Sequence, residues 1–192
     1  MSARSRDLPR RSCLSIPGSS EKMMGKGPGI PADMVFLDLE DAVAPKEKES
    51  SRARVANAIR TQDWGDKVLC VRVNDWSTKW TAFDIIEVVG GAGARLDEIM
   101  LPKVETAAQI VATDLLLRQV EIANGLPVGH IGIEAQIETA RGLINVEDIW
   151  NRDGGLNREG LRSEPSRKPS TDGDADMGVH CDNLLVAGVF NF

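Results

Sequence analysis

Short apolar runs that alternate with longer helix-like segments are the feature that most restricts how this chain can fold. The apolar runs cover residues 13–16, 34–39, 68–73, 99–101 and 131–137. Between them, apolar side chains recur at helical spacing in residues 46–60, 81–89 and 107–124. Glycine and proline follow several of these segments and mark turns. This alternation predicts repeated βα units around a parallel sheet.

Each apolar run is followed by residues that a hydrophobic core does not need. These residues are Pro17, Gly18, Ser19, Ser20, Asp38, Glu40, Asp41, Arg72, Asn74, Pro102, Lys103, Glu138 and Thr139. In parallel βα folds the carboxyl ends of the strands meet at the ligand site. The positions of these residues therefore predict a site at that end of the sheet.

The stretch VFLDLEDAV carries three acids directly after a strand that looks buried. Strand alternation places Asp38 and Glu40 on one face, whereas Asp41 also suits the first turn of a helix, where acids are favoured. Arg72 lies inside the apolar run VLCVRVN, and a buried guanidinium is costly without an anion. Its expected partner is an acid of the second run, a carboxylate of a substrate, or both.

Two further strand-end residues have alternative interpretations. Lys103 is either an ordinary exposed lysine or a site residue, and a Schiff-base role would require a lowered pKa. Glu138 is either the capping acid of a helix that Thr139 opens or a hard oxygen ligand for a divalent ion such as Mg²⁺. Similarly, Ser19 and Ser20 either present backbone N–H groups to an anion at a helix N-terminus or form a plain N-cap.

The charge of the chain argues against nucleic acid and acidic membranes as partners. The formal net charge is −6 and the pI is near 5.0, without a basic stripe that carries interleaved aromatic residues. No apolar run approaches the roughly 18 residues of a membrane span. The cysteines lie far apart without a CxxC pair, which favours reduced thiols. We expect a cytoplasmic or mitochondrial matrix protein that binds a small molecule.

The two ends of the chain differ from its middle. Residues 1–11 are rich in arginine and predict a solvated basic arm, with the remnant of a mitochondrial presequence as the alternative. Residues 12–150 hold the βα pattern. Residues 151–181 are polar and rich in Gly, Ser, Pro and Asp, which predicts a disordered insert. Residues 182–192 return to an apolar pattern that predicts a sixth strand.

Five motifs in series resemble the citrate lyase beta-subunit-like family. This is the HpcH/HpaI aldolase superfamily, which includes citryl-CoA, malyl-CoA and citramalyl-CoA lyases. The motifs lie within residues 10–148 and are RRSCLSIPGSSEKM, VFLDLEDAVAPKEKESSR, VLCVRVND, EIMLPKVETAAQI and IEAQIETARGL. The resemblance implies an α/β fold of the TIM (β/α)8-barrel type. It also implies a homo-oligomeric enzyme that cleaves or forms a carbon–carbon bond next to a carbonyl, usually with Mg²⁺.

The resemblance further implies catalytic roles for three residues. Arg72 corresponds to the arginine that binds the carboxylate or carbonyl oxygen of the substrate. Glu138 corresponds to a Mg²⁺ ligand that also faces the substrate. Asp38 is assigned to the same catalytic set as Arg72 and Glu138. Such a set suits aldol or Claisen chemistry, because Mg²⁺ and an arginine together stabilise the oxyanion that forms.

The remaining assignments concern residues that bind the substrate and residues that orient the arginine and metal-bound water. By the same resemblance, Arg11 and the Pro17-Gly18 turn match a first-strand motif near the substrate, and Lys103 is also assigned to substrate binding. Glu40 and Asp41 complete the acidic strand end that orients the arginine and metal-bound water.

Two departures from the family pattern affect these expectations. Asn191 stands where the family's second Mg²⁺ ligand, an aspartate, is expected, and the loss of a negative charge should weaken the site. An eight-unit barrel takes about 250 residues, whereas this chain supplies five units and a possible sixth strand. We therefore expect an incomplete barrel, truncated relative to a longer lyase that acts on 3-hydroxyacyl-CoA. The alternatives are an aldolase for free 2-oxo acids and an inactive fragment that associates with full-length subunits.

Overall fold

A computed structural model describes residues 8, 10–150, 179–181 and 184–188 of the chain. Its strands form one sheet in the order β1-β2-β3-β4-β5-β7-β6. All neighbouring pairs are parallel except β6 and β7, which are antiparallel. The strands are β1 (Cys13–Pro17), β2 (Met34–Asp38), β3 (Val68–Arg72), β4 (Glu98–Leu101), β5 (Gly132–Ile137), β6 (Val179–Cys181) and β7 (Leu184–Gly188).

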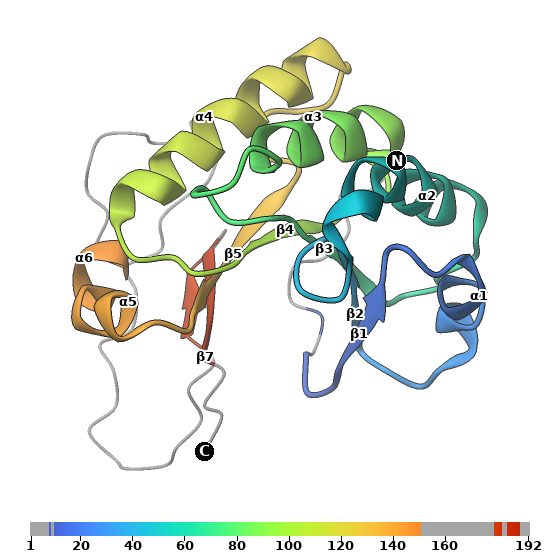
Figure 1. Cartoon of the computed structure of the whole chain (residues 1–192), viewed down its shortest axis with the longest axis horizontal. Coiled ribbons are helices and arrows are strands. Elements are labelled where there is room, and N and C mark those ends of the chain that lie inside the picture. Colours follow the sequence, from blue (N-terminus) through green and yellow to red (C-terminus); the bar gives the residue numbers. More distant parts are fainter. Residues whose placement is uncertain (1–7, 9, 151–178, 182–183, 189–192) are drawn as a thin grey trace.

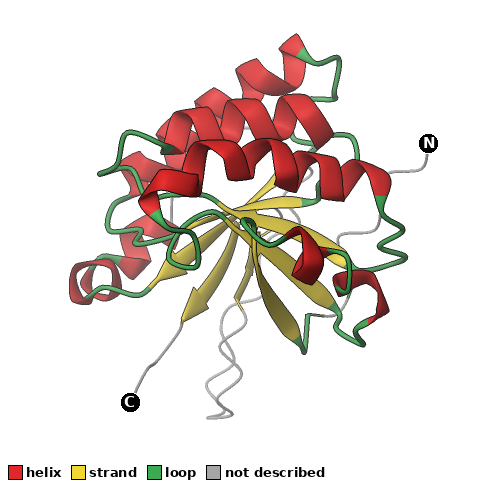
Figure 2. Cartoon of the chain, turned by 45° about the vertical axis from the view of Figure 1, so that its right-hand side comes forward, coloured by secondary structure: helices red, strands yellow, loops and turns green. Residues whose placement is uncertain are grey.

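Helices connect the parallel strands, and the three longest of them cover one face of the sheet (Figures 1 and 2). These three are α2 (Lys48–Thr61), α3 (Thr81–Ala92) and α4 (Ala107–Ala123). A capping box formed by Thr106 and Gln109 starts α4, because the two side chains satisfy backbone N–H groups that a helix leaves unpaired at its first turn. The shorter helices are α1 (Glu21–Met24), α5 (Ala140–Ile144), α6 (Val146–Trp150) and the 3-10 helices η1 (Gly27–Gly29) and η2 (Pro45–Glu47).

The hydrophobic core lies mainly between the sheet and the long helices. Side chains such as Leu37, Val71 and Leu101 are fully buried in this layer. Alternate residues of the same strands point to the opposite face, which we call the inner face because it would line the interior of a closed barrel. A second apolar cluster lies there and consists of Met34, Val68, Cys70 and Met100 with Phe36 and Leu8 at its edge.

The predicted βα organisation is confirmed, and the fold is α/β of the TIM-barrel type. Each of the five apolar runs forms one parallel strand, and the predicted sixth strand is β7, which pairs in parallel with β5. One boundary differs, since Val179–Cys181, which were assigned to the polar insert, form β6. Residues 151–178 of that insert, residues 189–192 and most of the basic arm lie outside the described residues.

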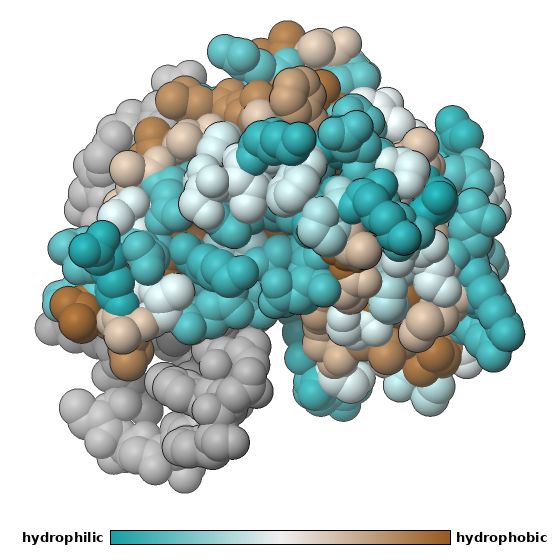
Figure 3. Space-filling view, in the orientation of Figure 1, coloured by the Kyte–Doolittle hydropathy of each residue, from teal (hydrophilic) through white to brown (hydrophobic). Residues whose placement is uncertain are grey.

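Exposed apolar side chains lie on helices α4 and α5. They include Leu115 and Ile122 on α4 and Leu143 and Ile144 on α5, and Figure 3 shows hydrophobic patches over both helices. Within the described residues, no helix has the length and apolar character that crossing a membrane requires.

Candidate active site at the carboxyl ends of the strands

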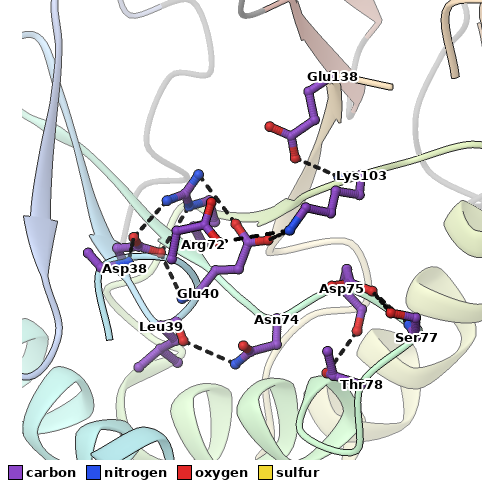
Figure 4. Close-up of polar contacts among 12 residues, drawn as sticks. Asp38, Leu39, Glu40, Arg72, Asn74, Asp75, Ser77, Thr78, Lys103 and Glu138 are labelled. Atoms are coloured by element: carbon purple, nitrogen blue, oxygen red, sulfur yellow. Dashed lines mark hydrogen bonds and ion pairs between the residues drawn. The ribbon is translucent and has the colours of Figure 1, made fainter. Parts of the chain in front are cut away.

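Asp38 and Arg72 form the centre of a charged group at the carboxyl ends of the strands. They end β2 and β3 and are register partners across that pair of strands. Arg72 donates from Nε to Asp38 Oδ1 at 2.9 Å and from Nη2 to Asp38 Oδ2 at 2.7 Å, as Figure 4 shows. This two-pronged geometry is the strongest form of the arginine–carboxylate pair. The expected acid partner of Arg72 is therefore Asp38.

The contacts of Asp38 hold Arg72 in place, as expected of the acidic strand end, while the assignment of Asp38 to the catalytic set stays a prediction. Its side chain is fully buried, and both oxygens also accept backbone N–H groups, from Glu40 at 2.8 Å and from Ala42 at 3.0 Å. Burial by itself would raise the pKa of Asp38, but the hydrogen bonds and charge of Arg72 outweigh it and hold the pKa below its usual value. Asp38 thus stays ionised and fixes Arg72, without an oxygen left for a substrate.

Glu40 and Lys103 form the second ion pair of the group. Lys103 Nζ lies 2.6 Å from Glu40 Oε1, and Arg72 Nη1 lies 3.4 Å from Glu40 Oε2. Burial raises the pKa of Glu40 above its usual value, although both cations act in the opposite direction. The hydrogen bond to Glu40 raises the pKa of Lys103, which is the opposite of what a Schiff-base amine requires. Exposed Asp41 lies 3.8 Å from Lys103 Nζ at the edge of the group.

Glu138 joins the group through the backbone of Lys103. Lys103 has a φ of 52°, a left-handed conformation that is uncommon in non-glycine residues, and its N–H donates to Glu138 Oε1 at 2.9 Å. The helix that follows is capped by Thr139, whose side chain accepts the N–H of Gly142. Glu138 is therefore not the helix cap but lies beside Lys103 (Figure 4).

The composition of this group, which we call the strand-end cluster, fits a hard divalent cation. Four carboxylates and two cations give it a formal net charge of −2, and the members are Asp38, Glu40, Asp41, Arg72, Lys103 and Glu138. Glu40 Oε2 is buried and accepts no hydrogen bond among the described residues. Only Oε1 of half-buried Glu138 takes a hydrogen bond there. Carboxylate oxygens with free lone pairs are the ligands that Mg²⁺ prefers.

A buried polar network behind the cluster holds the backbone that carries its acids. Lys48, on α2, donates to the carbonyls of Leu39 at 2.9 Å and Glu40 at 2.8 Å. Asn74 Nδ2 also donates to Leu39 O, at 3.1 Å, and both its amide groups donate to Asp84 of α3. Sequence periodicity located these helices but did not predict that Lys48 and Asp84 face inward. The backbone that carries the acids of the cluster is therefore held in place by side chains from α2 and α3.

We expect Lys48→Met to lower the free energy of unfolding by about 1–3 kcal/mol, because the buried Glu40 carbonyl loses its donor. Urea denaturation monitored by circular dichroism measures this difference. Lys46→Met is the matched control, since Lys46 is exposed in η2. Equal stabilities of the two variants would show that Lys48 does not support the acidic strand end.

Pro17 and Gly18 lie at the same end of the sheet, where the Gly18 N–H is already used within the fold. Pro17 is the register partner of Asp38. The Gly18 N–H donates to the Asp38 carbonyl at 2.8 Å, and Gly18 itself is buried. Gly18 therefore has a packing role, and its assignment to substrate binding stays a prediction. Ser20 accepts the Met23 N–H as the N-cap of α1, which is the simpler of its two interpretations.

Gly18→Ala tests this packing role. A Cβ at Gly18 would lie 2.7 Å from Val55 Cγ2 and 2.8 Å from the Asp38 carbonyl oxygen. We expect a loss of about 1–3 kcal/mol in the free energy of unfolding, the usual cost of overpacking. Gly29→Ala is the control because a Cβ there meets no atom within 4 Å, and equal unfolding midpoints for the two variants would refute the close approach.

Arg11 lies at the opposite end of the sheet, and its assignment to substrate binding disagrees with this position. It precedes β1, has an 80% exposed side chain and pairs with Asp33, which precedes β2. Parallel strands start at one edge and end at the other, so residues before β1 and β2 cannot reach the strand-end cluster. Asn191, the predicted second Mg²⁺ ligand, lies outside the described residues.

Comparisons with known proteins identify the family of the chain. The profile of the HpcH/HpaI aldolase/citrate lyase family matches residues 11–156. The chain is 42% identical over 141 residues to the L-malyl-CoA/beta-methylmalyl-CoA lyase of Cereibacter sphaeroides, which covers 73% of this chain and 44% of that protein. It is 39% identical over 142 residues to citrate lyase subunit beta of Leuconostoc mesenteroides subsp. cremoris, with coverages of 74% and 46%.

A solved structure with a similar fold is the CitE protein of Mycobacterium tuberculosis in complex with magnesium and acetoacetate. Its TM-score is 0.55 at 31% sequence identity, over 77% of this chain and 53% of that chain. The chain thus spans about half the length of the relatives that it matches.

Proposed function

Because the chain belongs to the HpcH/HpaI aldolase/citrate lyase family, we propose that the protein is a Mg²⁺-dependent carbon–carbon lyase for a 3-hydroxyacyl-CoA thioester. The observation that carries this proposal is the position of Arg72, whose guanidinium is fixed by Asp38 at the carboxyl end of β3 within a cluster that also holds Glu138. A fixed cation at that place suits a reaction in which negative charge develops on oxygen.

Malyl-CoA is the first substrate to test. The relative with 42% identity is named L-malyl-CoA/beta-methylmalyl-CoA lyase. Citryl-CoA and citramalyl-CoA share the required group, which is a hydroxyl at C3. C3 is bonded to C2, the carbon attached to the thioester carbonyl. Their additional substituents would contact parts of the site beyond the strand-end cluster, so Arg72 does not by itself select among them.

Cleavage breaks the bond between C2 and C3 of the acyl chain. The C3 hydroxyl gives its proton to a base and becomes the carbonyl of a 2-oxo acid, while the electron pair of the broken bond forms the thioester enolate at C2. The enolate then takes up one proton at C2 and is released as the shorter acyl-CoA, so the numbers of protons lost and gained are equal. We assign Arg72 to the hydrogen bond with the substrate oxygen or carboxylate at C3, where it stabilises charge. Asp38 keeps the guanidinium in place, and the Glu40–Lys103 pair holds the adjacent wall of the site.

Glu138 and, by the family resemblance, Asn191 would hold the metal. When bound, Mg²⁺ would act as a Lewis acid on the substrate oxygen. The support in this chain is the net charge of the strand-end cluster and the oxygens that remain available on Glu40 and Glu138.

A Mg²⁺ titration by calorimetry in the presence of glyoxylate tests the proposed site. We expect saturable binding to the full chain and tighter binding to Asn191→Asp, because a carboxylate adds a negative charge to the ligand set. Malyl-CoA turnover is measured on the same samples by the release of glyoxylate. A folded protein that binds neither Mg²⁺ nor malyl-CoA would contradict the proposal.

Two alternatives make different predictions in the same experiments. An aldolase for free 2-oxo acids would bind glyoxylate with Mg²⁺ but not CoA, so a titration with CoA separates it from the lyase. A catalytically inactive chain that joins full-length subunits is favoured by Asn191, an amide where the family resemblance expects an aspartate ligand. It would show no turnover alone and would co-elute with a full-length relative on size exclusion.

Self-association is the proposed quaternary state. The exposed apolar side chains of α4 and α5 support it, since apolar patches on a surface often mark protein interfaces. Multi-angle light scattering measures the mass directly, and a monomer at all concentrations would contradict it. The cytoplasmic or mitochondrial matrix location stays a prediction.

A further inference from the structure

A second group of potential ligands lies on the inner face, deeper than the strand-end cluster. Cys70 on β3, Glu98 on β4 and Glu134 on β5 place one thiol sulfur and two carboxylate oxygens within 4.8 Å of one another. Cys70 and Glu98 are register partners, and Glu134 is the partner of Met100, two residues after Glu98. Glu134 precedes Glu138 by four residues, which is about 13 Å along a strand. The two groups are therefore separate.

The inner group is buried among apolar side chains. Cys70 is 0% exposed, Glu134 3% and Glu98 9%, and Met34, Val68 and Met100 pack around Cys70. Two carboxylates rarely lie together in such surroundings without compensation, because each ion loses its hydration. Arg10 supplies part of the compensation through its ion pair with Glu98.

Glu134 is the member that this compensation offsets only in part, because the charge of Arg10 lowers its pKa less than burial and Glu98 raise it. Its Oε2 is buried and has no hydrogen-bond donor among the described residues. Burial, followed by the negative charge of Glu98, raises the pKa of Glu134 to about 8. An acceptor buried to this degree normally has a partner, and one carboxylate oxygen of Glu134 lies within 4.8 Å of the ligand atoms of Cys70 and Glu98.

We propose that Cys70, Glu98 and Glu134 form a binding site for a thiophilic divalent transition-metal ion such as Zn²⁺ or Co²⁺. Thiolate sulfur selects such ions over Mg²⁺, and the carboxylates add the hard ligands that Zn²⁺ also accepts. Counted over these four side chains alone, a thiolate, two carboxylates and the Arg10 guanidinium give a formal charge of −2, opposite in sign to that of a divalent ion. Ligand atoms about 2.0–2.3 Å from a shared ion lie about 3.5 Å from one another. The ligand atoms of the three side chains would therefore move together by roughly 1 Å on binding.

The site would bind its ion with release of protons, because thiols and carboxyls coordinate in their ionised forms. It does not depend on the proposed lyase activity. A lyase with Mg²⁺ at Glu138 is compatible with a second ion here, and the loss of one site leaves the ligands of the other in place.

Co²⁺ titration of the full chain tests the site, because Co²⁺ bound to thiolate gives a charge-transfer band in the near ultraviolet. We expect a saturable band at one equivalent that Zn²⁺ abolishes by competition. Cys70→Ala should lose the band, and Glu134→Gln, which keeps the side-chain shape, should weaken Co²⁺ binding at least tenfold. Circular dichroism confirms that each variant is folded.

Two controls locate the ion. Cys13→Ser removes an exposed free thiol and should keep the band, whereas a band that follows Cys13 instead of Cys70 would overturn the proposal. Glu138→Gln should also keep the band, which separates this site from the strand-end cluster even if the lyase proposal fails. No band in the wild-type chain would also overturn the proposal and leave a proton as the compensation for the two carboxyls.

Discussion

Replacing Arg72 with methionine is expected to lower the free energy of unfolding by about 3–5 kcal/mol at neutral pH. The substitution leaves Asp38, whose side chain is 0% exposed, as a buried carboxylate without its cation, and breaking one partner of a buried pair costs about this amount. The two backbone N–H groups that donate to Asp38 remain in the variant. The expected loss of free energy of unfolding is therefore due to the missing positive charge of Arg72. Urea denaturation of the wild type and the variant measures the difference.

The pH dependence gives this prediction a second readout. In the wild type the folded pKa of Asp38 is lowered, so its contribution to stability is present above the unfolded pKa and is lost as the pH falls through the folded pKa. Without Arg72, burial is opposed only by the two backbone hydrogen bonds, so the folded pKa of Asp38 should rise and the variant should lose less stability than the wild type as the pH falls. The difference between the two proteins should therefore shrink towards pH 4.

Arg72→Met combined with Asp38→Asn is the matched test. Removing both charges should recover much of the loss, because an uncharged buried pair has a smaller desolvation cost. A double variant that is as unstable as Arg72→Met would show that the pair does not account for the effect. Both proteins should lack lyase turnover, since Arg72 is the proposed oxyanion ligand.

Glu138→Gln is expected to reduce kcat/KM of the proposed lyase reaction by at least about 100-fold, or roughly 3 kcal/mol. The amide keeps an oxygen that can accept the Lys103 N–H, so the fold should change little, but it removes the negative charge that would hold Mg²⁺. The Mg²⁺ affinity in the presence of glyoxylate should fall in parallel. Turnover assays with malyl-CoA and calorimetry measure the two effects.

Glu147→Gln controls for the loss of one negative charge, because Glu147 is exposed on α6. It should leave both turnover and Mg²⁺ affinity unchanged. If Glu138→Gln retains wild-type turnover with a stable fold, the assignment of Glu138 as the metal ligand is wrong, whatever the fate of the family assignment.

The order of the elements and the place of the site were predictable from the sequence because both follow from local patterns. Alternating apolar runs and helical periodicity determine where strands and helices form, and parallel strands bring their carboxyl ends together. That reasoning placed Asp38, Arg72, Lys103 and Glu138 at one edge, where the structure has them.

What each side chain does at that edge was decided by tertiary structure alone. The register between β2 and β3 brings Arg72 to Asp38, whose two oxygens are occupied by Arg72 and by backbone N–H groups. Gly18 packs closely against the end of β2, and its N–H donates to the Asp38 carbonyl. The position of Arg11 before β1 places it at the opposite end.

The sequence by itself determined the α/β organisation, the family and the edge that carries the strand-end cluster, because these depend on residue types within short windows. Only the tertiary structure paired Asp38 with Arg72, placed Lys48 and Asp84 behind them and gathered Cys70, Glu98 and Glu134 on the inner face. Those contacts join residues that are distant in the chain, and strand register and helix packing determine which of them meet.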